Sequence, residues 1–177
     1  MRSLPKLITV AALLITACRV AGGDTTNVAL TFYVISEEKV AGGRFIDTAA
    51  IPKAGYIGPV ADLVVTNLLD VYPQQSAPLS TMIDTNGNRT VVTNATRPAL
   101  TIVLPPEEAK RFAALTERAV RKRLLVMVGD KPLTAPVIMM PIETGSVMIE
   151  FGGEFGGQAQ ADKVERDLKK LIKHKQG

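Results

Sequence analysis

The sequence predicts an α+β sandwich, with two helices on one face of a mostly antiparallel sheet. Apolar runs rich in β-branched residues recur along the chain and favour strands. Two amphipathic helices are expected in the carboxyl half, where the order is strand, helix, strand, one or two strands, helix. Hydrophobic residues make up 46% of the 177 residues, which is enough to build a core.

The first half of the chain begins with a clear strand pattern and then becomes irregular. Val28–Ile35 is β-branched and aromatic, which predicts a strand. Ser36–Pro59 is rich in glycine and proline, and we expect an ordered loop with at most a short turn of helix. Asp62–Tyr72 fits either a strand or a helical turn, because Val64 and Val65 favour a strand while its other residues permit a helix.

Turn-forming residues dominate the middle of the chain. Pro73–Ser80 holds two prolines and is expected to interrupt regular structure. Thr81–Asn94 predicts a hairpin, because Asn86 and Gly87 tolerate the positive φ that a tight β-turn needs.

The carboxyl half carries most of the predicted regular structure. A helix is expected to begin at Pro105-Pro106, since proline suits a first turn and the acidic Glu107 and Glu108 suit the positive end of the helix dipole. Its core face comprises Ala109, Phe112, Leu115, Ala119 and Val120. The second helix spans Gln158–His174, with an apolar face of Ala161, Val164, Leu168, Leu171 and Ile172. Strands are predicted for Pro98–Leu104, Arg123–Gly129, Ala135–Ile142 and Ser146–Gly152.

Met1–Ala17 has the features of a secretory signal peptide. Arg2 and Lys6 form a short basic region. The apolar run Leu7–Ile15 that follows is too short to span a bilayer core of about 30 Å. The next residues, Ile15-Thr16-Ala17-Cys18, resemble the lipobox of bacterial lipoproteins.

This resemblance implies that Cys18 is the lipid attachment site, with diacylglycerol on its thiol and fatty acyl chains such as palmitate holding it in a membrane. Residues 18–27 would then be a lipidated tether, and the protein would lie in the bacterial cell envelope, facing the periplasm. Arg19 follows the cysteine in place of aspartate, which favours the outer membrane over the inner one.

The composition argues against several functions. Without the signal segment the chain has 19 basic and 17 acidic residues, too balanced a charge to predict a nucleic-acid partner. The sole histidine, His174, lies in a lysine-rich tail, and the sole cysteine is Cys18. Nucleophilic catalysis and zinc binding both lack the residues they need. We therefore expect no enzyme activity, no catalytic residue, no cofactor and no metal.

Four methionines in the carboxyl half allow two interpretations. Thioethers can bind Cu(I), but Met139 and Met140 are adjacent on a predicted strand and would point to opposite faces. Packing in the core is the favoured hypothesis for Met127, Met139, Met140 and Met148.

A series of motif positions runs from the first predicted helix to the last predicted strand. In the helix they are Phe112, Ala113, Leu115 and Thr116. Further along they are Lys122, Arg123, Asp130, Lys131, Ala135, Pro136, Val137, Ile138, Ile142, Gly145, Ile149 and Gly152. Their order and spacing resemble the head part of the first periplasmic domain of the export protein SecD, over about Ala99–Leu171.

The resemblance implies a SecD-head-like, ferredoxin-like sandwich over residues 98–177, with residues 28–97 adding strands and a long loop to the same globular unit. It implies a binding or accessory module that contacts another envelope protein or a translocating, unfolded polypeptide, and exposed sheet edges offer one means of contact. The alternative is a small-molecule or lipid-binding lipoprotein, in which the loop Ser36–Pro59, with Phe45, Ile46, Tyr56 and Ile57, covers an apolar pocket.

Overall fold

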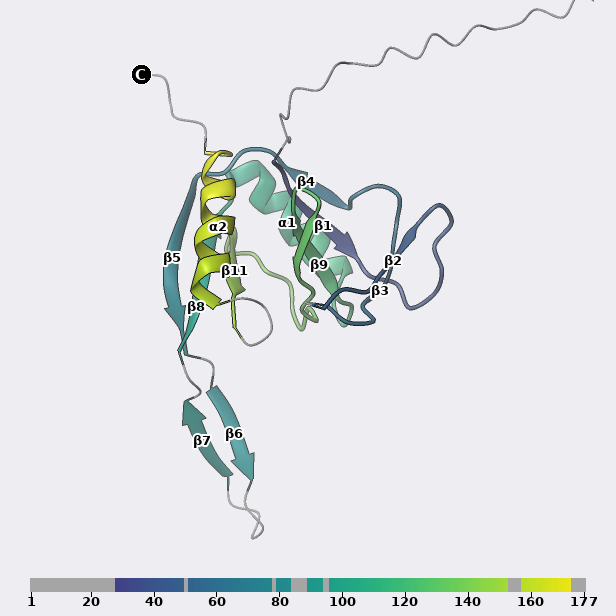
Figure 1. Ribbon diagram of the computed structural model, residues 1–177. Coiled ribbons are helices and arrows are strands. Elements are labelled where there is room, and N and C mark those ends of the chain that lie inside the picture. The colour runs from purple at the N-terminus through teal and green to yellow at the C-terminus, as the bar shows by residue number, and fades with distance from the viewer. Residues whose placement is uncertain are drawn as a thin grey trace, which may run out of the picture.

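The structure, a computed structural model, describes residues 28–49, 51–77, 79–83, 89–93, 96–152 and 157–172. Its strands are β1 (Leu30–Val34), β2 (Arg44–Ile46), β3 (Gly55–Ile57), β4 (Leu63–Val65), β5 (Asp70–Ser76), β6 (Leu79–Ile83), β7 (Arg89–Thr93), β8 (Arg97–Val103), β9 (Leu124–Val128), β10 (Lys131–Thr134) and β11 (Ser146–Glu150). Its helices are α1 (Pro106–Arg118) and α2 (Gly157–Lys169) (Figure 1). The predicted α+β class with mostly antiparallel sheets is confirmed.

The main sheet has four antiparallel strands in the order β10-β9-β1-β4. Leu30 on β1 pairs with Val128 of β9 on one side and with Val65 of β4 on the other. A strand covered on both faces is apolar at every position, and all five residues of β9 are buried. The Val28–Ile35 strand is confirmed, and it lies in the middle of this sheet.

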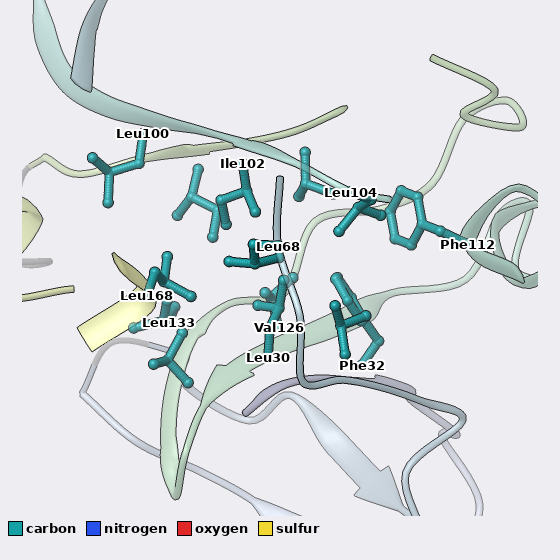
Figure 2. Packing of buried hydrophobic residues seen from close by; sticks show 14 of the residues in the cluster. Leu30, Phe32, Leu68, Leu100, Ile102, Leu104, Phe112, Val126, Leu133 and Leu168 are labelled. Atoms are coloured by element: carbon teal, nitrogen blue, oxygen red, sulfur yellow. The ribbon is translucent and has the colours of Figure 1, made fainter. Parts of the chain in front are cut away.

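The larger core lies on one face of the main sheet and joins both helices to a second sheet. Phe32 on β1 contacts Phe112 on α1, with ring centroids 4.9 Å apart. Figure 2 shows Leu100 and Ile102 of β8, Leu168 of α2 and residues of the main sheet gathered in this core. Both helices therefore cover the same face of the main sheet.

The second sheet has the order β11-β8-β5 and is also antiparallel. Val147 and Ile149 on β11 are buried in the larger core, while Met148 between them is 54% exposed. Strand residues alternate between faces, so this sheet has one covered face and one open face.

β5 runs through Pro73 to Ser76, which corrects the prediction that Pro73–Ser80 interrupts regular structure. Proline is tolerated there because β5 is an edge strand.

A smaller core lies on the opposite face of the main sheet, beneath the hairpin of β2 and β3. It contains Ile35, Ile46, Ile51, Ala54, Ile57, Leu125 and Met127. The prediction of a loop with at most a helical turn over Ser36–Pro59 is therefore wrong. The short apolar stretches around Ile46 and Ile57 pair as strands because together they cover the apolar outer face of β9.

β6 and β7 form a two-stranded arm that extends away from the ends of β5 and β8 (Figure 1). The predicted hairpin over Thr81–Asn94 is confirmed, although its turn residues, Asn86 and Gly87, lie outside the described residues. The ambiguous segment Asp62–Tyr72 is resolved as strand, because it contains β4 and the start of β5.

The first helix occurs as expected and the second is shorter than expected. α1 has proline and two acidic residues in its first turn and buries Phe112, Leu115 and Thr116. α2 ends at Lys169, five residues before the predicted His174. The chain leaves the helix there because Ile172 forms a β-bridge with Leu68, and the Leu68 N–H donates to the Leu171 carbonyl at 3.0 Å.

The predicted strand Ala135–Ile142 is wrong. Val137 and Ile138 form only isolated bridges, with Arg123 and Val120 respectively. Pro136 and Pro141 lack the backbone N–H group that hydrogen bonding to a neighbouring strand requires. The segment therefore cannot pair continuously.

A candidate binding cleft at the end of the central strand

An open cleft of about 710 Å³ lies where β1 ends, between the β2–β3 hairpin and the turn that joins α1 to β9. Its walls come from four segments that are separate in sequence but meet at this end of the main sheet. The cleft is lined by Val34, Ile35, Ser36, Glu37, Phe45, Lys53, Ala54, Gly55, Arg121, Lys122, Arg123 and Val137.

One part of the cleft is apolar and accessible. The ring of Phe45 is 49% exposed and makes an edge contact with Tyr56 on the paired strand, with ring centroids 5.0 Å apart. Val137, from the Ala135–Ile142 segment, also lines the cleft and is 51% exposed. Exposed apolar side chains on two walls offer a surface that an apolar ligand group can desolvate.

The lining of the cleft is also basic. Four cations line it, Lys53, Arg121, Lys122 and Arg123, against one carboxylate, Glu37. The salt bridges found among the described residues involve none of these five. An excess of positive charge in a concave site attracts anions.

Arg123 fixes the base of the cleft. Its Nε donates to the Ala135 carbonyl at 3.2 Å, and its Nη1 donates to the Ala54 carbonyl at 3.4 Å. These bonds join the start of β9 to the hairpin side and to the Ala135–Ile142 segment. The guanidinium is half-buried, and both of these acceptors are neutral, so its charge is only partly compensated.

Two of the basic residues have an unusual backbone. Lys53 has φ 46° and Arg121 has φ 65°, and both are in the left-handed region that favours glycine. The Lys53 N–H donates to Asp47 Oδ1 at 3.0 Å, and the Arg121 N–H donates to the Ile138 carbonyl at 2.7 Å. Local hydrogen bonds therefore hold both residues in these conformations.

The segment that supplies Val137 continues into two exposed methionines. Met139 is 77% exposed and Met140 is 70% exposed, while Met148 is also exposed. The predicted core packing is therefore wrong for these three and right for Met127, which is 3% exposed. Flexible, polarizable thioethers at a surface suit contact with varied apolar groups.

A second groove, of about 680 Å³, lies between β10 and α2. The Lys131 ammonium beside Lys163 lowers the pKa of Lys163 below its usual value. The pKa of Asp167 is also lowered, chiefly because its carboxylate accepts a 2.6 Å hydrogen bond from Lys170. Here a carboxylate already offsets the cations, unlike the arrangement in the first cleft.

Of the residues named from the sequence, Phe45, Lys122, Arg123 and Val137 line this cleft. Cys18 and His174 lie outside the described residues, as do the predicted signal peptide and tether. Within the described residues no group of three histidine, cysteine, aspartate or glutamate side chains is placed to hold a metal ion. Neither helix of the described chain combines the length and apolar character needed to cross a membrane.

Sequence reasoning missed the basic cleft, although one sign of it was visible. Arg121-Lys122-Arg123 follows the predicted helix directly, at a position where glycine commonly ends a helix. Lys53 gave no comparable sign, because its approach to the Arg121–Arg123 turn depends on the unpredicted hairpin.

The fold is an α+β domain with two helices on one face of its main antiparallel sheet. No family model matches the sequence. A stretch of 73 residues is 36% identical to the protein translocase subunit SecDF of Thermus thermophilus. The match covers 41% of this chain and 10% of that protein, so this chain corresponds to a small part of its relative.

A solved structure agrees on the fold. A structure of SecDF, described as a membrane component that enhances protein export, superposes with a TM-score of 0.50 at 22% identity. The superposition covers 80% of this chain and 61% of that one. A second structure, SecDF in its super-membrane-facing form, gives a TM-score of 0.49 at 21% identity, over 80% of this chain and 18% of the other. The 36% identical stretch and the first of these superpositions confirm the expected SecD-head-like domain.

Proposed function

We propose that this chain is a non-enzymatic accessory lipoprotein of the bacterial envelope that binds unfolded or translocating polypeptide. The observation that carries the proposal is an open cleft with apolar and basic walls on a SecD-head-like domain. Cys18 would anchor the chain to a membrane, with the domain facing the periplasm.

The surface beside the cleft suits ligands of varied sequence. Unfolded polypeptides expose apolar side chains that a folded protein buries, and they present them in no fixed arrangement. Phe45, Val137, Met139 and Met140 together offer an aromatic ring, a branched chain and two flexible thioethers. Adaptable surfaces of this composition are typical of proteins with many partners.

The proposal is tested by measuring binding of the purified full chain to a permanently unfolded polypeptide, followed by fluorescence anisotropy. We expect the unfolded form to bind and its native, folded counterpart not to bind. The double variant M139S/M140S should weaken binding about tenfold or less, because two partly exposed thioether contacts are lost.

Met148→Ser is the matched control, because Met148 is also exposed but lies on β11 of the second sheet, whereas Met139 and Met140 continue the segment that supplies Val137 to the cleft. It should leave the affinity unchanged. Equal affinity for folded and unfolded polypeptide, or no binding of either, would refute the proposed function. Saturable binding of a small apolar compound in place of polypeptide would favour the alternative role as a small-molecule or lipid-binding lipoprotein.

A further inference from the structure

The four cations of the cleft take part in none of the salt bridges found among the described residues. Lys53, Arg121 and Lys122 are exposed at the rim, and Arg123 is half-buried at the base. Elsewhere on the described surface, basic side chains of α1 and α2 pair with acidic neighbours, as Lys110 does with Glu107 at 3.0 Å. The cleft cations form no salt bridge among the described residues, and the carboxylates near them are Glu37 in the lining and Asp47, whose Oδ1 accepts the Lys53 N–H.

The two left-handed residues strengthen this argument. For a residue with a Cβ, the left-handed conformation costs about 1–2 kcal/mol, and glycine would remove that cost. At both Lys53 and Arg121 the chain instead carries a long cationic side chain, and both side chains line the same cleft. Local backbone preference does not explain these residue types, whereas a role for their charges does.

We propose that the cleft selects acidic, apolar peptide segments, which deepens and rests on the proposed polypeptide binding. Carboxylates of the segment would pair with Arg121, Lys122 and Lys53, and its apolar side chains would lie against Phe45 and Val137. Arg123 has donors beyond the two it uses and can receive a carboxylate that reaches the base of the cleft.

The distribution of the lining favours a peptide over a phospholipid. Cations and apolar groups are interspersed around the cleft, since Lys53 adjoins Ala54 and the Arg121–Arg123 turn faces Val137. An extended peptide carries alternating side chains to opposite sides and can match such a pattern. A phospholipid instead concentrates its charge at one end and its apolar chains at the other.

The test uses three synthetic peptides of equal length in which phenylalanine alternates with aspartate, asparagine or lysine. Affinity for the full chain is measured at low and at high salt. We expect the aspartate peptide to bind about tenfold more tightly than the asparagine peptide at low salt, because several partly exposed ion pairs act together. Salt should reduce this preference by screening, and the lysine peptide should bind most weakly.

Two variants assign the preference to the cleft. R121Q/K122Q removes both charges while keeping polar side chains, and it should reduce the acidic preference to near equality. Arg121→Gly also removes a charge while suiting φ 65°, so it should reduce the preference in a chain that folds normally. The matched control is K110Q/R111Q, which removes the same two residue types from the first turns of α1, outside the cleft lining.

The outcomes distinguish the preference for acidic peptides from the more general binding of polypeptide. If all three peptides bind equally, or if R121Q/K122Q keeps the acidic preference, the inference is wrong while polypeptide binding stands. If no peptide binds, both fail.

The full chain carrying Cys18→Ser is also tested on phosphatidylcholine vesicles with and without phosphatidylglycerol. Binding to the anionic vesicles alone, lost in R121Q/K122Q, would overturn the inference in favour of a lipid headgroup site.

Discussion

A single buried hydroxyl connects the first helix to the irregular segment that borders the cleft. Thr116 on α1 is fully buried, and its Oγ1 donates to the Ala113 carbonyl at 3.0 Å. The same oxygen accepts the Ile142 N–H at 2.9 Å. Because the segment Ala135–Ile142 has no ladder to hold it, this bond fixes the end of the segment against α1.

Thr116→Val should destabilise the protein although the side chain keeps its shape. The change leaves the half-buried Ile142 N–H without its acceptor, which costs about 1–3 kcal/mol in free energy of unfolding. Chemical denaturation measures the loss, and hydrogen exchange should show that the Ile142 amide loses protection. Thr116→Ser is the control, because it keeps the hydroxyl and should preserve that protection. An Ile142 amide equally protected in both variants would show that the bond does not hold the segment.

At this scale the sequence predicted the apolar core better than the polar contacts. Phe112 and Leu115 recur at helical spacing, so their burial followed from periodicity. Thr116 could not be recognised as a buried anchor, because its partner lies 26 residues away in a segment without regular structure. The cleft was hidden for the same reason: its cations meet only through tertiary contacts.

At the scale of elements, the prediction succeeded where one local pattern determined the outcome. β9 is apolar throughout, and α1 combines helical periodicity with proline and acids in its first turn. The prediction of elements failed where a proline lies within an apolar run. In β5, Pro73 is accommodated at a sheet edge, whereas the prolines of Ala135–Ile142 prevent a strand. Apolar character alone does not separate these two cases, since the position in the sheet decides.

The arm of β6 and β7 is an element that pairs only with itself among the described residues. Ser76 of β5 pairs directly with Arg97 of β8, so residues 77–96 leave and re-enter the second sheet at adjacent positions. A two-stranded hairpin is marginally stable by itself, and the body of the domain does not require it to close β5 onto β8.

Replacing residues 77–96 with the two-residue turn Asn-Gly should leave the domain folded. Asn-Gly suits a tight hairpin between paired strands, and the core residues in the described part of the chain lie outside the excised segment. We expect the free energy of unfolding to change by about 1 kcal/mol or less. Leu100→Ala on β8, which removes a fully buried side chain, should cost about 2–5 kcal/mol and serves as the comparison. A loss of cooperative unfolding on excision would show that the arm belongs to the core.

At the scale of the whole molecule, the chain entry and the cleft lie at opposite ends of one strand. The described chain enters at Val28, next to β1, where the Gly129 N–H donates to the Ala29 carbonyl at 2.9 Å. The cleft begins at Val34, where β1 ends. An anchor joined at the first end would leave the cleft directed away from the membrane, toward ligands in the periplasm.

This arrangement makes the anchor separable from binding. Cys18→Ser removes the only thiol that can carry diacylglycerol, so we expect the variant to leave the membrane fraction and to lose the mass of the acyl groups. Its affinity for unfolded polypeptide should equal that of the parent chain, because no cleft residue lies near the entry end of β1. Membrane fractionation and intact mass spectrometry test the first expectation, and anisotropy tests the second.

A Cys18→Ser chain that stays with membranes while lacking the lipid mass would rule out the anchor. A chain that is released but no longer binds would show that the cleft depends on the membrane.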